Sequence, residues 1–206
     1  MTSKKSSSLL LLASSSPVRR QILHNAGLLF EVRPSKIDEE KIREQLLKKD
    51  SDQSPSEIAL LLAEEKGLDV SKSFPHSLVV GCDQVLTTGS EIFSKPKSLL
   101  QARQTLEKLR GKTHYLHSGV VLAKNGVTIW REVDTAKLTM HSFTDPFLEG
   151  YLKRVGETVL GCVGAYQFEG LGVCLFEQVQ GDYYTILGLP LLPLLRELRR
   201  MQEIDQ

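Results

Sequence analysis

Cysteine is scarce in this sequence, and its spacing excludes two classes of protein. The 206 residues include only three cysteines, Cys82, Cys162 and Cys174, and no two of them form a Cys-x-x-Cys pair. An odd number of widely spaced cysteines supports neither a disulfide framework nor a structural zinc site. Cysteine usage of this kind is typical of a cytoplasmic protein.

The chain also lacks an excess of charge and a long hydrophobic run. Lys and Arg together number 26 and Asp and Glu 25, which leaves a formal net charge of +1. Proteins that bind nucleic acid or membrane surfaces through charge usually carry a basic excess, so we expect neither partner. The apolar run that follows MTSKKSSS is too short for a secretory signal or a membrane span. An acidic small substrate, by contrast, needs only a local basic cluster.

The most informative stretch is 9–23, with the sequence LLLLASSSPVRRQIL. Its apolar run, Leu9–Ala13, has the length of a strand buried on both faces. A serine-rich turn follows, and a helical pattern begins at Pro17, for which Ser16 is the predicted N-cap. The stretch therefore predicts a strand, a tight turn and the exposed N-terminus of a helix.

Two arginines, Arg19 and Arg20, lie in the first turn of this helix. Free backbone N–H groups at a helix start bind anions, and guanidinium groups grip phosphate oxygens in bidentate fashion. The pattern indicates a phosphate site. An ordinary capped helix with solvated arginines would have the same sequence, so this stretch alone leaves both readings open.

Two further helices begin with acidic or capping residues. The stretch Ile37–Glu40 opens a predicted helix that runs to about Lys48, and its acids either cap the helix or bind the magnesium of a phosphorylated substrate. The next helix begins after Ser54 with a capping box, and we expect it to end near Lys66, just before Gly67. By itself, Lys66 at this position reads as a cation that balances the helix dipole.

An acidic residue, Asp83, lies inside the buried-strand pattern SLVVGCDQVL of residues 77–86. A carboxylate is costly to bury unless it is paired or binds a metal, so Asp83 is a candidate functional residue. Lys95 and Lys97 follow just before a predicted helix at Leu99–Leu109. They could supply a further cation to the same cleft.

The second half of the chain predicts more strands and a glycine-rich loop. An Asn-Gly pair between two strand patterns is a strong hairpin signal. The loop holds Tyr166 and Glu169 among four glycines. The predicted elements are strands at Thr113–Ala123 and Val127–Leu138, a helix at Phe147–Val155, the loop Gly161–Gly172, a strand at Val173–Val179, a short strand ending at Ile186, and a helix at Leu191–Met201.

These stretches together resemble the Maf family of nucleotide pyrophosphatases along nearly the whole chain. Each match alone would be weak, but so many in the right order are specific. The matching motifs are Ser14–Arg20, Asp38-Glu39, Ala63–Lys66, Asp83-Gln84, Lys95-Pro96, Gly164–Tyr166 with Glu169-Gly170, and Gly181–Tyr183 followed by Gly188–Pro190.

The resemblance implies an α/β fold of the inosine triphosphate pyrophosphatase (Maf/Ham1) type. We therefore expect a single domain over residues 1–206, with a long mixed sheet, flanking helices and two lobes around a central cleft, usually as a homodimer. It also implies a house-cleaning hydrolase of the cytoplasm that splits a nucleoside triphosphate into the monophosphate and pyrophosphate. The cofactor would be a divalent metal cation, Mg²⁺ or Mn²⁺.

The resemblance assigns roles to individual residues. Asp83 would accept a proton from the attacking water or bind the metal, and both possibilities stay open. Glu39 would be a metal or water ligand. The phosphate-binding residues would be Ser14, Ser16, Arg19 and Arg20, and the charge-stabilising residues Lys66 and Lys95.

Within the family, Gln84 and Glu169 resemble the subgroup that acts on 7-methyl-GTP. A carboxylate accepts two hydrogen bonds, which matches the N1–H and N2–H₂ edge of guanine, and it favours the positive charge of an N7-methylated base. Val18 is a departure, because this subgroup is expected to carry a stacking aromatic residue there; Tyr166 is an aromatic residue that could compensate. The alternatives are a dTTP/UTP pyrophosphatase of the same family and a non-catalytic nucleotide-binding regulator of cell division.

Overall fold

The computed structural model describes residues 9–48 and 53–204. The segment MTSKKSSS, residues 1–8, lies outside the described residues. The strands are β1 (Leu10–Leu12), β2 (Glu31–Val32), β3 (Leu78–Thr88), β4 (Glu91–Phe93), β5 (Thr113–Lys124), β6 (Val127–Met140) and β7 (Phe176–Gln180). The helices are α1 (Pro17–Asn25), α2 (Glu39–Lys48), α3 (Pro55–Ser73), α4 (Leu99–Leu109), α5 (Asp145–Val155), α6 (Tyr183–Ile186) and α7 (Leu191–Arg200), with 3₁₀ turns η1 (Gly156–Gly161) and η2 (Leu171–Leu175).

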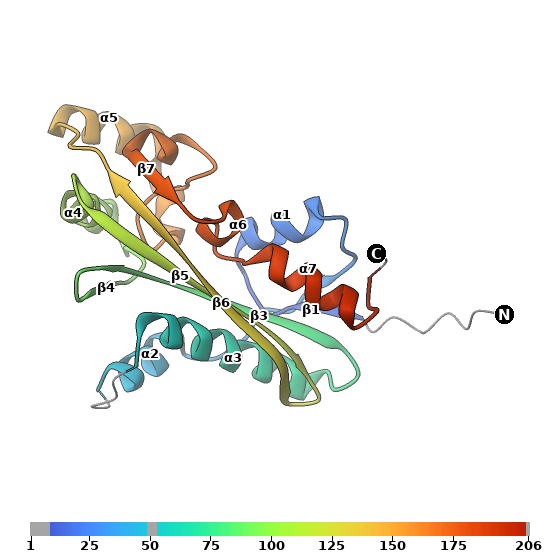
Figure 1. The fold of residues 1–206 in the computed structure, drawn as a ribbon. Coiled ribbons are helices and arrows are strands. Elements are labelled where there is room, and N and C mark those ends of the chain that lie inside the picture. Colours follow the sequence, from blue (N-terminus) through green and yellow to red (C-terminus); the bar gives the residue numbers. More distant parts are fainter. Residues whose placement is uncertain (1–8, 49–52, 205–206) are drawn as a thin grey trace.

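The strands form one mixed sheet of seven in the order β2-β1-β3-β5-β6-β7, with β4 paired to β3. β1 runs parallel to β2 and β3, and the other pairs are antiparallel. In Figure 1, α2 and α3 cover one face of the sheet, whereas α1 and α7 cover the other. The expected α/β fold with a long mixed sheet and flanking helices is therefore confirmed.

Separate hydrophobic clusters lie toward the two ends of the long strands. Near β1, side chains alternate between the two faces of the sheet: Leu10 and Leu12 pack toward α1 and α7, and Leu11 packs toward Val70 of α3. At the other end, the distal halves of β5 and β6 pack with α4, α5 and η1. Figure 1 shows α4 and α5 at this end of the sheet.

Local signals in the sequence account for several element boundaries. Ser16 caps α1, with Pro17 in its first turn, and Ser54 forms a capping box with Glu57 at the start of α3. The β5–β6 hairpin turns through Asn125 and Gly126, whose φ angles of 52° and 73° require the left-handed conformation that this pair adopts readily.

The predicted end of α3 is wrong. The helix does not end before Gly67 but continues to Ser73, because Gly67 lies in its interior against the sheet. A Cβ on Gly81 of β3 would lie 2.2 Å from the carbonyl oxygen of Ala63 and 2.8 Å from the backbone nitrogen of Gly67. Both glycines are therefore needed for close packing of the helix on the strand.

Near the C-terminus, the expected short strand ending at Ile186 is a one-turn helix, α6. Asp182 caps it by accepting hydrogen bonds from the backbone of Tyr184 and Thr185, and such a cap outweighs the strand preference of these residues. The preceding strand begins at Phe176 rather than Val173, because η2 occupies 171–175. None of the helices in the described ranges is long and apolar enough to cross a membrane.

Candidate active site

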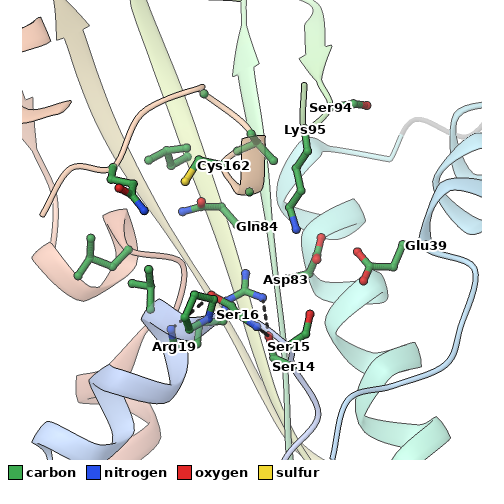
Figure 2. Close-up of a pocket in the computed structure, with 18 of the residues that line it drawn as sticks. Ser14, Ser15, Ser16, Arg19, Glu39, Asp83, Gln84, Ser94, Lys95 and Cys162 are labelled. Carbon is green, nitrogen blue, oxygen red and sulfur yellow. Dashed lines mark hydrogen bonds between the residues drawn. The ribbon is translucent and has the colours of Figure 1, made fainter. Parts of the chain in front are cut away.

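The structure contains an open cavity of about 460 Å³. It is lined by the turn between β1 and α1, by residues of α2, α3 and β3, by Ser94, Lys95 and Lys97, and by residues of the 158–169 segment. Figure 2 shows side chains from these elements converging on one space. Most of the residues that the sequence singles out therefore meet at one place: Ser14, Ser16, Val18, Arg19, Glu39, Lys66, Asp83, Gln84, Lys95 and Glu169.

Lys66 and Asp83 form a buried ion pair at the centre of the cavity. Lys66 Nζ lies 2.5 Å from Asp83 Oδ1 and 2.9 Å from Glu39 Oε2. The Lys66 and Asp83 side chains are only 7% and 6% exposed, whereas that of Glu39 is 45% exposed. Lys66 is thus not a solvated helix-end cation but the partner that compensates the burial of Asp83.

Neighbouring residues of β3 project to opposite sides, because side chains alternate along a strand. Asp83 points toward α3 and pairs with Lys66, while Gln84 points toward α6. The amide of Gln84 donates to the carbonyls of Thr185 and Ile186 at 3.1 Å each and to Ser118. Two carbonyl acceptors can bind only the NH₂ end, so the Gln84 amide has one defined orientation.

Lys95 reaches into the cavity from the segment after β4, and Figure 2 shows its ammonium directed toward Asp83. Burial of the ammonium and the nearby Arg19 guanidinium hold the pKa of Lys95 below its ordinary value, against the opposing pull of the Glu39 carboxylate. Lys95 makes no hydrogen bond to another residue in the described ranges, so its donors are available to a ligand.

Arg19 is buried behind the serine-rich turn. Its Nε donates to the carbonyl of Gly188 at 2.8 Å, and its Nη1 donates to the carbonyl of Cys82 and the hydroxyl of Ser14. The side chain thus ties α1 to β3 and to the turn before α7, and it still lines the cavity. Its neighbour Arg20 is exposed and does not line the cavity, so the structure separates the expected arginine pair.

The cavity wall beyond Gln84 comes from the glycine-rich loop. Tyr166 is buried there, with its hydroxyl 2.8 Å from His114 Nε2 and its ring edge against Phe176. Burial lowers the pKa of His114 to about 4, so the imidazole is neutral at pH 7. Glu169 lies exposed at the rim. Tyr166 is therefore a packed wall residue, and Glu169 is accessible from solvent.

The carboxylates present fit a metal that arrives with its substrate. Among the described residues, no group of three or more His, Cys, Asp or Glu side chains could hold a metal by itself. Mg²⁺ commonly binds one or two protein carboxylates together with substrate phosphates and water. Glu39 and Asp83 supply two such carboxylates, and Asp83 Oδ2 is buried without a hydrogen-bond partner in the described ranges.

One further cavity residue, Arg43, is not among those to which the sequence points. Arg43 lies on α2, four residues after Glu39, and this helical spacing places the two on one face. Glu40 of α2 forms an exposed ion pair with Lys97 at 3.0 Å. The position of Arg43 was open to prediction from the helix period, whereas the ion pair depends on tertiary contacts that no local pattern reveals.

The chain is similar to proteins of one family along nearly its entire length. The family model for Maf-like proteins matches residues 9–201. A 7-methyl-GTP pyrophosphatase from Rhizobium etli is 49% identical over 194 residues, which cover 94% of this chain and 96% of that protein. A 7-methyl-GTP pyrophosphatase from Brucella abortus is 50% identical over the same extent.

Two other proteins show weaker similarity. A nucleoside triphosphate pyrophosphatase from Rhodopseudomonas palustris is 44% identical over 191 residues, or 93% of each chain. A HAM1 protein from Coxiella burnetii matches with 12% identity and a TM-score of 0.42 over 65% of this chain and 73% of that one, which is too weak to carry an argument. On the family match and the relatives near 50% identity, the chain belongs to the Maf family.

Proposed function

We propose that the protein hydrolyses 7-methyl-GTP to 7-methyl-GMP and pyrophosphate. The observation that carries the proposal is the buried carboxylate Asp83, placed among Lys66, Lys95 and Arg19 in one cavity. The relatives of matching length that are named 7-methyl-GTP pyrophosphatase support the substrate. A pure binding protein has no need for a carboxylate buried at such cost, which disfavours the regulator alternative.

The reaction is an in-line displacement at the α-phosphorus. Water attacks, the new bond to its oxygen forms, and the bond to the bridging oxygen of the β-phosphate breaks, so pyrophosphate leaves. Asp83 Oδ2 has no hydrogen-bond partner among the described residues and accepts the proton of the water. Lys66 holds the other carboxylate oxygen in place.

Negative charge grows on the phosphoryl and leaving oxygens during this step. Cations held in position before the reaction stabilise that charge without reorganisation, which is usually the largest contribution to catalysis. Lys95 is suited to this task, since its donors are available to a ligand. Glu39 would hold Mg²⁺ or Mn²⁺, with Asp83 as a second ligand in the alternative in which it does not act as the base, and the metal would neutralise phosphate charge as a Lewis acid.

The recognition of the base follows from Gln84 and Glu169. With its NH₂ group held by α6, Gln84 presents only its carbonyl oxygen to a ligand. Two acceptors, this oxygen and the Glu169 carboxylate, suit the N–H donors of guanine better than the mixed edge of uracil or thymine. The negative charge of Glu169 also favours a cationic methylated base. Val18 lines the cavity as an aliphatic residue, so it provides no aromatic surface on which the base could stack.

The function is tested by pyrophosphate release from 7-methyl-GTP, GTP, UTP, dTTP and CTP, each with Mg²⁺ and with Mn²⁺. We expect a clear preference for 7-methyl-GTP. A preference for UTP or dTTP would show that 7-methyl-GTP is not the substrate, while the proposed hydrolysis at the α-phosphorus would still stand. No release from any nucleotide would favour the regulator.

Asp83→Asn is the matching test of the chemistry. We expect turnover to fall by about 10³-fold or more, because the amide cannot accept the proton, while nucleotide binding is largely spared. Single-turnover rates and calorimetric binding separate the two effects. Near-normal turnover would show that Asp83 does not accept the proton of the attacking water.

Glu169→Gln tests the recognition of the base. Loss of a charged acceptor should lower the kcat/KM ratio of 7-methyl-GTP to UTP by about 10- to 100-fold. Glu177→Gln, an exposed position on β7, is the control for loss of charge. An unchanged ratio of the two kcat/KM values would show that Glu169 does not recognise the base.

The homodimer and the cytoplasmic location also belong to this proposal. Light scattering of the purified protein and fractionation of cells test them separately.

A further inference from the structure

Two buried polar groups meet in the cavity without a hydrogen bond between them. Nη2 of Arg43 lies 3.8 Å from Oδ2 of Asp83, close enough for attraction but too far for a hydrogen bond. Asp83 Oδ2 and Arg43 Nε are both buried, and neither has a hydrogen-bond partner among the described residues. Buried polar atoms are nearly always satisfied, so an unsatisfied pair in a functional cavity indicates the place of a ligand.

Helix α2 fixes Arg43 at this position. Ile42 and Leu46 of the same helix pack on the cluster that contains Ile58 and Leu62 of α3. The Arg43 side chain is 15% exposed. A guanidinium held this way loses little conformational freedom when it binds, unlike a long cation on the surface.

Three other cations of the cavity form ion pairs or hydrogen bonds with protein groups. Lys66 lies between two carboxylates, Arg19 donates to two backbone carbonyls, and Lys97 pairs with Glu40. Among the cavity cations in the described ranges, Lys95 makes no hydrogen bond to another residue and the buried Nε of Arg43 makes none either, so both keep donors for a phosphate. Their positions beside Asp83 place them at the reacting end of a bound triphosphate.

We propose that Arg43 is a further catalytic residue, whose guanidinium binds an oxygen of the α-phosphate while that phosphate is hydrolysed. The proposal rests on the proposed function, since it adds a group to the same reaction. Water held by Asp83 must lie about 3 Å from the α-phosphorus to react. A guanidinium beside the same carboxylate oxygen therefore lies next to the phosphoryl oxygens, where its fork can donate two hydrogen bonds.

The test compares Arg43→Gln and Arg43→Lys with Lys41→Met, which removes a positive charge from the exposed side of the same helix. Steady-state rates with 7-methyl-GTP give kcat and KM. Calorimetry gives the binding of 7-methyl-GMP, which carries the α-phosphate, and of pyrophosphate, which does not. Thermal melting confirms that each variant is folded.

We expect Arg43→Gln to lower kcat by about 100-fold with a small change in KM, as for removal of a donor that acts in the transition state. Arg43→Lys should recover part of the loss, because it keeps the charge but not the fork. Binding of 7-methyl-GMP should weaken about tenfold in Arg43→Gln, while binding of pyrophosphate and all properties of Lys41→Met stay within twofold.

A kcat of Arg43→Gln within threefold of wild type, with unchanged binding of 7-methyl-GMP, would overturn the proposal. Weaker binding of pyrophosphate alone would also overturn it, because Arg43 would then contact the leaving group. If the wild-type protein hydrolyses no nucleotide, the proposed function fails, and the comparison of monophosphate binding still decides the role of Arg43.

Discussion

At the scale of single residues, the central feature of the cavity is the buried ion pair of Lys66 and Asp83. Asp83 stands out because a carboxylate in a buried strand requires a partner. That partner is Lys66, which by itself reads as an ordinary helix-end lysine. The difference arises because the pairing joins residues 17 positions apart on two elements, and no local pattern records such a contact. Arg19 and Arg20 look alike in sequence, yet only Arg19 reaches the cavity.

Lys95 carries a prediction at this scale. Its pKa is lowered, chiefly by burial and by Arg19, so its ammonium loses its proton at a lower pH than an ordinary lysine does. If that charge stabilises the reacting phosphate, activity should decline on the alkaline side as pH rises through this lowered pKa. Lys95→Arg keeps its charge and should retain activity to higher pH.

The measurement is kcat/KM for 7-methyl-GTP as a function of pH. Lys153→Arg, at an exposed position on α5, should leave the alkaline limb where it is in the wild-type protein. An alkaline limb of Lys95→Arg that coincides with that of the wild type would show that another group is responsible.

At the scale of elements, capped helices and the Asn-Gly hairpin are predictable, because their signals lie within a few residues. The length of α3 is not predictable in this way. Gly67 resembles a glycine that ends a helix, but it lies inside α3, where it packs against the sheet. β3 and β5 contribute glycines to the same contact: a Cβ on Gly119 would lie 2.8 Å from the carbonyl oxygen of Ala59. The segments of α3 that flank these contacts carry Lys66, so the fit of helix on sheet sets the geometry of the ion pair.

Gly81→Ala tests this packing. The added methyl group would overlap the backbone of α3, and we expect a loss of about 3 kcal/mol in the free energy of unfolding together with a fall in activity. Gly150→Ala is the contrasting variant, because nothing lies within 4 Å of the added Cβ on α5. It should stabilise the protein by about 1 kcal/mol, since alanine favours a helix over glycine. Urea unfolding measures both; equal stabilities would contradict the close contact.

At the scale of the whole molecule, the buried His114 links stability to pH. Burial lowers its pKa to about 4 in the folded state, against about 6.5 when it is exposed. Between these values the unfolded chain binds more protons than the folded one, so stability falls as pH falls through this window. The contribution of His114 is a loss of about 2.5 kcal/mol between pH 7 and pH 4.5.

Unfolding free energies measured across this range should therefore decline less steeply in His114→Gln than in the wild type. The glutamine amide keeps a polar partner for Tyr166 but does not titrate. Parallel curves for the two proteins would mean that His114 does not contribute to the acid sensitivity.

The alternation of side chains along β3 has a consequence for how such an enzyme can change over generations. The residue that we propose activates water and the residue that we propose faces the base are neighbours in sequence, yet they depend on different supports, α3 for Asp83 and α6 for Gln84. Mutations around α6 and the glycine-rich loop can therefore alter which nucleotide is accepted without disturbing the hydrolytic machinery. One scaffold can in this way diversify into enzymes that remove different nucleotides while inheriting the same chemistry.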